Sequence, residues 1–370
     1  MEKTFGEVVL FARTGLNPRK NFTLGHGTNK YITIKNIHNN TLVIDANTDL
    51  VDDEAIAMIH RRSQIKAGDI LFCSIGRIGD MYIIENEPVG WDVNESVFVF
   101  TLNTTIIRQK YFYYLFKHRD TIEYLIANSS GSTFKSIKMN QLQKMVFDLP
   151  SLDEQDKIVS LLDSLANIID SRQQQLRTFD TLIKARFVEM FGDPITNTKK
   201  LDTKELKDAL MLKAGDFTAA SDISDEPTET NIYPCFGGNG IRGYVTEYNQ
   251  EGEYSLIGRQ GALSGNVQFA SGKFKNTEHA LLVTPLVEMN SIWLNQLLIN
   301  LDLKRFQTGA AQPGLSVKNL QEIRILSVSI DEQNNFAEFV QQIDKSKVVI
   351  QKALDKAQLL FDSLMQKYFG

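Results

Sequence analysis

The tetrapeptide Leu152-Asp153-Glu154-Gln155 recurs in the second half of the chain as Ile330-Asp331-Glu332-Gln333. The shift that relates these copies also carries Phe191-Gly192 onto Phe369-Gly370. Self-similarity at a fixed spacing is the mark of a structural unit that occurs more than once. The sequence therefore predicts one unit of about 180 residues that is used twice, as a pseudo-twofold internal repeat.

A long helix is predicted after each copy of this tetrapeptide. No Pro or Gly interrupts residues 153–191, and the two acidic residues that open each copy suit the positive end of a helix dipole. As a helix, each stretch of ~40 residues would be ~60 Å long. Apolar residues recur at alternating spacings of three and four, which is a heptad seam. The seam consists of Leu162, Leu165, Ile169, Leu176, Phe179, Ile183 and Met190, with Arg172 and Arg186 in the gaps, and of Val340, Ile343, Lys347, Ile350, Leu354, Ala357, Phe361, Leu364 and Tyr368.

The two seams most simply pack against each other as an antiparallel coiled coil, because a domain separates them in the sequence. The alternative is that each helix packs on its own domain as a core element. Lys347 occupies the seam where the first copy has Ile169. Such a lysine either weakens the seam locally or holds a polar contact to a partner.

The remaining part of each unit alternates strand patterns with loops, which predicts an α+β fold with two similar α/β domains. We expect strands at residues 30–34, 68–72, 96–101, 254–258 and 280–284, and helices at 108–127 and 291–306. The expected order is a domain at 1–150, a long helix at 151–192, a second domain at 193–329 and a second long helix at 330–370.

The composition is that of an ordinary globular protein, with 42% hydrophobic and 23% charged residues. The net charge of −5 argues against a chain that binds nucleic acid alone, since such proteins usually carry a basic excess. Two distant cysteines, and five histidines in no metal-binding spacing, exclude cysteine-pair zinc sites. No apolar run approaches the length of a membrane span and no signal-peptide pattern opens the sequence, so we expect a cytoplasmic protein.

Two short motifs of enzymes occur, and neither predicts catalysis. Residues 238–243, GNGIRG, fit the dinucleotide-binding pattern, but a strand is expected after them where that pattern needs a helix, so we interpret them as a Gly-rich hairpin. Glu205-Leu206-Lys207 fits half of a nuclease site, a pattern that arises easily by chance. No nucleophile motif or phosphate-binding loop is present. We expect a chain that binds, without a catalytic residue, metal or cofactor of its own.

The chain resembles the specificity subunit of type I restriction–modification systems over nearly its whole length. The resemblance is carried by the twofold organisation, by LPSLDEQDKIVSLL with a helix ending in KARFVEMFGDP, and by SVSIDEQNNFAEFV with the final QKYFG. The second domain adds IYPCFGGNGIRGYV, SLIGRQGALSGNV and NTEHALL. The resemblance implies two target recognition domains and two long helices that are the family's central and C-terminal conserved regions.

The resemblance also implies a function and partners. Each domain is expected to read one half-site of a bipartite, asymmetric sequence in double-stranded DNA, with the coiled coil setting the spacer. Two methyltransferase subunits, which supply catalysis and S-adenosylmethionine, and restriction subunits are the expected partners. Leu161, Ile168 and Phe187, beside the seam, are candidate docking residues, with plain core packing as the alternative. A coiled-coil adaptor without a DNA role, or an enzyme with an unrecognised site, is the alternative function.

The loops supply the candidate DNA-binding residues. The patterns Gly76-Arg77-Ile78-Gly79 and Gly258-Arg259-Gln260-Gly261 are expected at equivalent places, because Gly permits close approach and Arg is the commonest reader of phosphate and guanine. Residues 128–135 and 308–313 are equivalent polar loops that can donate to phosphates. The alternatives are a solvated surface turn and a flexible loop, and we interpret His279 as structural. The full set is Lys30, Lys35, Ser74, Arg77, Ser132, Thr133 and Lys135 in the first domain, and Asn239, Arg242, Tyr244, Arg259, Gln260, Lys273, Lys275 and Gln312 in the second.

Overall fold

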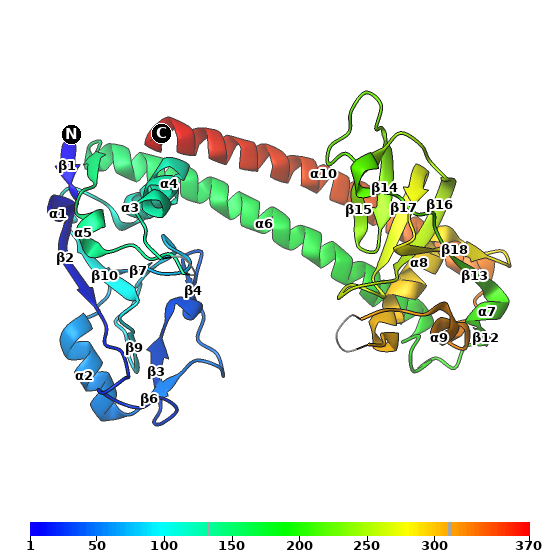
Figure 1. Cartoon of the computed structure of the whole chain (residues 1–370), viewed down its shortest axis with the longest axis horizontal. Helices are drawn as coiled ribbons and strands as arrows, with labels where there is room; N and C mark the ends of the chain where they lie inside the picture. The colour runs from blue at the N-terminus through cyan, green and yellow to red at the C-terminus, as the bar shows by residue number, and fades with distance from the viewer. Residues whose placement is uncertain (132–133, 310–312) are drawn as a thin grey trace. The chain divides into compact units, whose positions relative to one another are not determined.

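A computed structural model describes residues 1–131, 134–309 and 313–370 (Figure 1). It contains two compact units, one made of Met1–Ser171 with Leu354–Gly370 and the other of Arg172–Ala353. Each unit therefore holds one globular domain together with part of both long helices. The domain boundaries predicted at residues 150, 192 and 329 separate each domain from the long helix that follows it in the sequence. They stay a prediction.

Two helices of 40 residues each carry the predicted seams, α6 (Leu152–Phe191) and α10 (Ile330–Phe369). In the first unit, Leu162 near the start of α6 shares a core with Met365 near the end of α10. In the second unit, Phe187 near the end of α6 packs on Phe336 near the start of α10, with 5.5 Å between ring centroids. The helices thus run antiparallel, as predicted, and every seam residue is buried or half-buried. No helix in the described part of the chain is both long and apolar enough to cross a membrane.

Lys347 lies in the seam within the second unit and finds its partner on α6. Its Nζ is 2.7 Å from Asp180 Oδ1 and 3.6 Å from Asp344 Oδ1. Three quarters of the lysine side chain is shielded from water, whereas Asp180 is mostly exposed. The seam therefore accommodates this lysine through an ion pair inside the chain.

The domain of the first unit is built around a sheet of four antiparallel strands in the order β2-β10-β7-β8. Smaller sheets, β6-β3-β9, β1-β11 and β4-β5, complete it. The elements are β1 (Glu2–Thr4), α1 (Phe5–Val8), β2 (Val9–Thr14), β3 (Asn29–Ile32), a 3₁₀ turn (Ile34–Asn36), β4 (Ile37–His38), β5 (Thr41–Leu42), β6 (Leu50–Val51), α2 (Asp53–Ser63), β7 (Ile70–Cys73), β8 (Met81–Ile83), β9 (Trp91–Val93), β10 (Val97–Leu102), α3 (Gln109–Lys117), α4 (Arg119–Ala127), α5 (Met139–Leu142) and β11 (Val146–Asp148).

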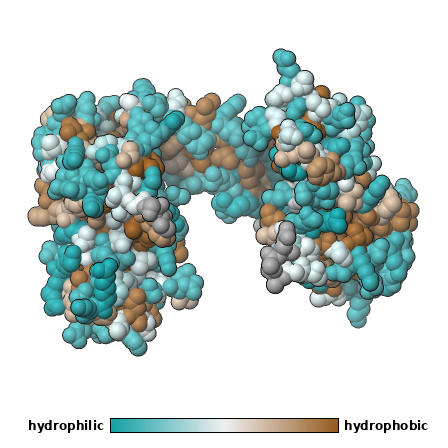
Figure 2. Space-filling model, viewed as in Figure 1, coloured by the Kyte–Doolittle hydropathy of each residue, from teal (hydrophilic) through white to brown (hydrophobic). Residues whose placement is uncertain are grey.

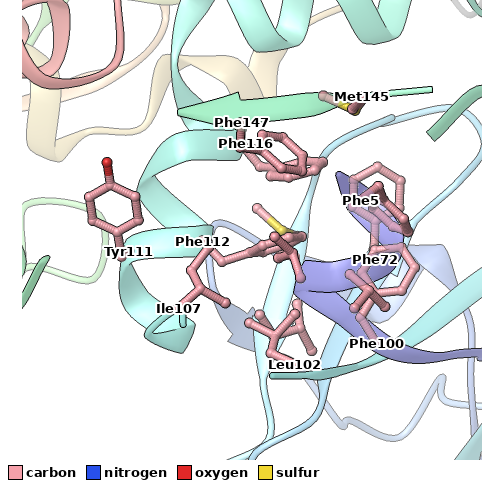
Figure 3. Close-up of a cluster of buried hydrophobic side chains, with 14 of the residues drawn as sticks. Phe5, Phe72, Phe100, Leu102, Ile107, Tyr111, Phe112, Phe116, Met145 and Phe147 are labelled. Atoms are coloured by element: carbon pink, nitrogen blue, oxygen red, sulfur yellow. The ribbon is translucent and has the colours of Figure 1, made fainter. Parts of the chain in front are cut away.

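An aromatic-rich core fixes this sheet against α3 (Figure 3). Phe100 of β10 lies at its centre, with ring centroids 5.5 Å from Phe5, 5.4 Å from Phe72 and 6.2 Å from Phe112. Such aromatic pairs contribute about 0.5–1.5 kcal/mol each beyond the area that they bury. The rings hold β7 and β10 in place, and the loop after β7 therefore starts from a rigid strand end.

The domain of the second unit repeats this frame. Its sheet has the order β13-β18-β16-β17-β14-β15, in which the first four strands match β2-β10-β7-β8, and the pair β12-β19 matches β1-β11. The elements are β12 (Thr203–Glu205), α7 (Leu206–Ala209), β13 (Leu210–Ala214), a 3₁₀ turn (Ala220–Asp222), β14 (Tyr233–Gly237), β15 (Gly240–Val245), β16 (Gln250–Gly258), β17 (Val267–Asn276), β18 (Ala280–Pro285), α8 (Ser291–Asn300), a 3₁₀ turn (Leu303–Phe306), α9 (Val317–Gln321) and β19 (Arg324–Leu326). The GNGIRG segment forms the turn after β14 and the first part of β15, which is the predicted hairpin.

The glutamine of the repeated tetrapeptide joins each long helix to its domain. Gln155 and Gln333 are 0% and 3% exposed. Gln155 Oε1 accepts a hydrogen bond from the backbone nitrogen of Arg108 at 2.9 Å, and Gln333 Oε1 accepts one from that of Asn290 at 2.9 Å. The donors are the residues that cap α3 and α8. Each side-chain Nε2 donates to nearby backbone carbonyls at 2.8–3.0 Å, so the amide satisfies buried polar groups on both sides.

Both helices predicted inside the domains are shorter than expected. The helix predicted at 108–127 is two helices, α3 and α4, because the backbone of His118 is extended with φ −64° and ψ 143°. The helix predicted at 291–306 ends at Asn300, and left-handed backbone at Asp302 with φ 47° precedes a 3₁₀ turn. The apolar pattern continues through both breaks, and the sequence therefore does not mark them.

Candidate nucleic-acid interface

Three turns of the second unit meet around Gly258, the last residue of β16. They are the β14–β15 turn at 238–239, the β16–β17 loop at 259–266 and the β17–β18 turn at 277–279. A Cβ on Gly258 would lie 2.1 Å from the carbonyl oxygen of Gly238, so only glycine fits there. The backbone nitrogen of Arg259 donates to the carbonyl oxygen of His279 at 2.9 Å. Segments that are distant in the sequence are thereby fixed side by side.

Two arginines near these turns have guanidinium groups without a partner among the described residues. Arg259 and Arg242 are exposed, and neither guanidinium has a hydrogen-bonded or charged partner among the described residues. The stem of Arg242 lies across Gly237, where a Cβ would come within 2.6 Å of its Cδ. A guanidinium offers a planar set of donors that matches phosphate oxygens and the O6 and N7 of guanine. This pair is therefore the strongest part of the candidate interface.

Polar side chains from the three turns bond to one another beside these arginines. Asn239 Oδ1 accepts from Asn266 Nδ2 at 3.0 Å. Gln260 Oε1 lies 3.1 Å from His279 Nδ1, and the Nε2 of the same ring lies 3.1 Å from Glu278 Oε1. Both Asn239 and Gln260 are exposed and keep hydrogen-bonding capacity on their outer side.

The other described candidates of the second unit lie along strands and already have partners. Lys273 Nζ lies 4.8 Å from the centre of the Tyr248 ring. Lys275 Nζ lies 3.7 Å from Asp216 Oδ2, and its side chain is 19% exposed. Tyr244 pairs through its backbone with Ser224. Lys273 and Lys275 lie on β17, an inner strand of the sheet, and their contacts make them weaker candidates than the two arginines.

Arg77 of the first unit directs its guanidinium at the chain itself. Nη2 donates to the carbonyl oxygens of Ile34 and Ile37 at 2.5 and 3.1 Å, and Nη1 lies 2.6 Å from His38 Nδ1. Nε lies 3.4 Å from Asp80 Oδ2. Arg77 therefore clamps the segment 34–38 onto the loop after β7.

Lys35 and Lys135 lie next to the segments that Arg77 holds together. Ser74 and Lys30 do not present a side chain at this place. The carbonyl of Lys35 contacts His38 Nε2 at 3.0 Å, and the carbonyl of Lys135 accepts from the nitrogen of Gly76 at 3.0 Å. Both lysines are exposed. Ser74 is 6% exposed and donates its hydroxyl to a backbone carbonyl, while Lys30 pairs with β9 earlier on β3.

The two loops correspond in the fold, but Arg77 and Arg259 do not occupy equivalent positions in them, contrary to the prediction. β7 ends at Cys73 and β16 ends at Gly258. Directly after these ends, the nitrogen of Ile137 donates to the carbonyl of Ser74 at 2.9 Å, and the nitrogen of Leu315 donates to that of Arg259 at 2.8 Å. Arg259 therefore corresponds to Ser74.

The same hydrogen bonds match Gly76 to Gly261, and they place Arg77 at a position that does not match Arg259. The nitrogen of Gly76 donates to Lys135 and that of Gly261 donates to Pro313, and the two glycines have φ of +72° and +83°. The backbone register at this loop thus differs from the one that the matching Gly-Arg pairs indicate. Arg77 then corresponds to Ala262, and the two domains present different side chains at matched backbone positions.

The polar loops predicted as equivalent are equivalent. Ser130 and Ser136 pair as an isolated β-bridge in the first unit, and Thr308 and Gly314 pair in the same way in the second. The predicted site residues Ser132, Thr133 and Gln312 lie outside the described residues. Those three assignments stay predictions.

Four polar residues of the candidate interface escaped the sequence prediction or were assigned another role: His38, Asn266, Glu278 and His279. The NTEH segment was visible, but its contact with Gln260 depends on folding. Among residues 1–131, 134–309 and 313–370, no three His, Cys, Asp or Glu side chains gather as metal ligands. Both cysteines are buried, and burial raises the pKa of the Cys73 thiol to about 12.

The long helices expose apolar side chains between polar ones (Figure 2). Leu161 and Ile168 are 39% and 45% exposed, as a docking surface requires. Phe187 is 0% exposed and packs on Phe191 and Phe336, so for this residue the alternative of plain core packing holds and a docking role does not. Further exposed apolar residues on the two helices are Leu182, Val188, Val348, Val349, Leu359 and Leu360.

Comparison with known proteins agrees with this architecture. A family model described as the type I restriction modification DNA specificity domain matches residues 1–178 and 198–359. The chain belongs to this family. Each matched segment falls within one copy of the repeat, and the resemblance seen in the sequence is thereby confirmed.

Specificity subunits of type I restriction enzymes are similar in sequence over part of the chain. The EcoprrI specificity subunit of Escherichia coli is 34% identical over 244 residues, which is 63% of this chain and 60% of the relative. The HindI specificity subunit of Haemophilus influenzae is 25% identical over 171 residues, which is 45% of this chain and 37% of the relative. The chain thus covers less than two thirds of the length of either relative.

Two solved structures share the fold along the whole chain. The S subunit of a type I restriction–modification system from M. genitalium has a TM-score of 0.65 and 17% identity, covering 100% of this chain and 96% of its own. A chain from a study of complex assembly and conformational transition of the type I R-M system has a TM-score of 0.57 and 17% identity, covering 100% and 97%. At this identity the likeness shows the fold, which is that of two domains with an antiparallel coiled coil.

Proposed function

We propose that this chain is the DNA recognition subunit of a type I restriction–modification complex. Each domain reads one half-site of a bipartite, asymmetric sequence, and the coiled coil sets the spacer between the half-sites. The family match over both copies of the repeat carries the proposal. The chain contributes no catalytic residue in this proposal.

The matched backbone and unmatched side chains support an asymmetric target. Arg259 in the second domain corresponds to buried Ser74 in the first, and Arg77 corresponds to Ala262. Backbone contacts fix the pose of a protein on DNA, whereas side chains at base edges read the sequence. Two domains that share a pose and differ in these side chains would read different half-sites.

The charge of the chain supports a function inside a complex. The first domain has 17 Lys and Arg against 16 Asp and Glu, and the second has 13 against 16. Affinity for duplex DNA comes largely from neutralised phosphates and released counterions, so near-neutral domains bind weakly alone. Partner subunits would therefore supply part of the affinity.

Methyltransferase subunits are the proposed partners, together with restriction subunits. A base within duplex DNA must be flipped out before an enzyme can methylate it. In this proposal two methyltransferase subunits bring that pocket and S-adenosylmethionine, and they dock on the exposed apolar side chains of α6 and α10 around Leu161 and Ile168. The proposed number of two rests on the family resemblance, and the twofold repeat supports it.

Sequencing of methylated bases tests the proposal directly. Cells that express the chain with its methyltransferase partner are expected to carry methylation at one bipartite motif, and cells without the chain are expected to lack it. Binding to duplexes of that motif should appear only when the partner is present, with a strong salt dependence. A chain that binds its partners and leaves DNA methylation unchanged would instead be the adaptor considered above.

A further inference from the structure

The turn Glu278-His279 begins a chain of hydrogen bonds that ends at Gln260. Glu278 Oε1 lies 3.1 Å from His279 Nε2, and His279 Nδ1 lies 3.1 Å from Gln260 Oε1. The second carboxylate oxygen, Glu278 Oε2, accepts from the backbone nitrogen of Thr218 at 3.3 Å. Glu278 is therefore held from one side and orients the imidazole on the other.

The carboxylate dictates where the imidazole carries a proton. An ionised carboxylate only accepts hydrogen bonds, so His279 Nε2 must be the donor in this contact. Nδ1 then has a lone pair in a neutral ring and a proton in a charged ring. A half-turn of the Gln260 amide exchanges its oxygen and its NH₂ group, and the amide can satisfy either state.

The orientation of the amide decides what Gln260 presents at the candidate interface. Against a neutral ring, the NH₂ group of Gln260 donates to Nδ1 and Oε1 points outward as an acceptor. Against a charged ring, Oε1 accepts from Nδ1–H and the NH₂ group points outward as a donor. In the major groove an outward acceptor matches the amino groups of adenine and cytosine, whereas an outward donor matches guanine O6 or thymine O4.

We propose that Glu278 and His279 are positioning residues that set whether Gln260 offers an acceptor or a donor to a base edge. The inference rests on the proposed function, because it names how one position of the second half-site is read. The contact in the structure, with Gln260 Oε1 toward Nδ1, is the donor-outward arrangement. Against a neutral ring with Nε2 protonated the amide turns, and Gln260 then selects adenine or cytosine over guanine or thymine at that position. A doubly protonated ring reverses the preference.

Glu278 is the charged group in contact with the imidazole. Two neighbouring segments contact this turn through the backbone: the nitrogen of Arg259 donates to the carbonyl of His279, and the nitrogen of Glu278 donates to the carbonyl of Asp216, whose side chain pairs with Lys275. The β14–β15 turn contributes backbone only, through Gly238.

The substitution Glu278→Gln reverses the direction of the hydrogen bonds from residue 278 to Gln260 and keeps nearly the same side-chain shape. The nitrogen of Thr218 holds the oxygen of the new amide, so its NH₂ group faces His279 Nε2 and donates to it. The proton of a neutral ring then moves to Nδ1, and Gln260 turns its own NH₂ group outward. The matched control is Glu247→Gln, the same change at an exposed residue of the second unit with no partner among the described residues.

The test uses the complex of the full chain with its methyltransferase partner at pH 8.5, on duplexes randomised over both half-sites. Methylated products are sequenced. Glu278→Gln is expected to shift the preference at one position of the second half-site by about tenfold, from adenine or cytosine to guanine or thymine, as one hydrogen bond allows. The first half-site and the spacer should stay as in the wild type and in Glu247→Gln.

Two results would overturn the inference: an unchanged preference in Glu278→Gln, or a uniform loss of methylation at all sequences. If that variant does not fold, Gln260→Ala at the exposed position decides, because the preference at the same base position must then disappear. A constant preference overturns the inference and leaves the proposed function standing. A wild-type complex that methylates no defined sequence overturns both.

Discussion

Replacing Arg259 by alanine is expected to weaken the reading of one half-site and leave the fold intact. The side chain is exposed and has no partner among the described residues, so the free energy of unfolding should change by less than ~0.5 kcal/mol. An arginine that reads a base edge contributes about 1–3 kcal/mol of discrimination. Affinity for DNA with the correct second half-site should therefore fall about 5- to 150-fold.

Replacing Arg77 by alanine is expected to act through stability instead. The change removes hydrogen bonds to the carbonyls of Ile34 and Ile37 and the contact with His38. Each such bond is worth about 0.5–1.5 kcal/mol, and the ion pair with Asp80 adds little because Arg77 is 41% exposed. After a discount for this exposure, we expect a loss of about 1–2 kcal/mol and weaker reading of the first half-site only.

Both variants are compared in two assays. Thermal denaturation of the chain reports stability, and titration of the methyltransferase complex with duplexes altered in one half-site reports reading. Arg62→Ala, at an exposed arginine without a partner among the described residues, controls for the loss of a positive charge. The reasoning is refuted if Arg259→Ala weakens both half-sites equally, or if Arg77→Ala leaves the melting temperature unchanged.

Three further perturbations follow from the contacts of the long helices. Gln155→Ala and Gln333→Ala should each lower the free energy of unfolding by about 1–3 kcal/mol in denaturant titrations, because buried backbone groups lose their partner, whereas Gln173→Ala at an exposed position of α6 should have little effect. Lys347→Ile should raise stability by about 1 kcal/mol, since an apolar seam replaces an ion pair with a mostly exposed Asp180, and a lower melting temperature would contradict this. Four residues inserted into α6 before Gly192 lengthen the helix by ~6 Å, which is roughly two base pairs at ~3.4 Å each. The methylated motif should therefore change its spacer and keep both half-sites. New half-sites would contradict the proposal that the coiled coil sets the spacer.

The long helices could be predicted because their evidence is local. Apolar residues such as Leu162 and Val340 belong to seams with a regular spacing of three and four. The second seam, which is the partner of the first, lies in the same chain. The structural role of Gln155 could not be seen in this way, because its donor, Arg108, lies 47 residues away. The repeated tetrapeptide marked the position and gave no sign of the contact.

The choice between docking and core packing at Phe187 has a physical cause that the sequence does not show. Its place beside the seam exposes a side chain in the middle of a coiled coil, as at Ile168. Near the end of α6 the domain packs on the helix, and the Phe191 ring there meets Trp293 of α8 at 6.0 Å. Burial of Phe187 is thus decided by the domain, and the heptad pattern carries no information about it.

The wrong match of Arg77 with Arg259 shows where an alignment of the two copies by sequence fails. Matching glycine–arginine pairs suggested one register, but the hydrogen bonds after β7 and β16 follow another. Sequence identity between copies is least dependable in these loops, because their side chains face outward and are not fixed by packing. The backbone bonds around Gly76 and Gly261 are the feature that the two copies share.

This division between a shared backbone and differing side chains bears on how such a domain changes its target. The carbonyls of Ser74 and Arg259 accept the same bond, although one side chain is buried and the other is exposed. A substitution at Arg259 therefore leaves the loop in place and alters only what it offers to DNA. A substitution at Gly261 instead forces a side chain into left-handed backbone and displaces the loop. Changes of specificity should accumulate at positions of the first kind, because they alter reading without requiring the frame to refold.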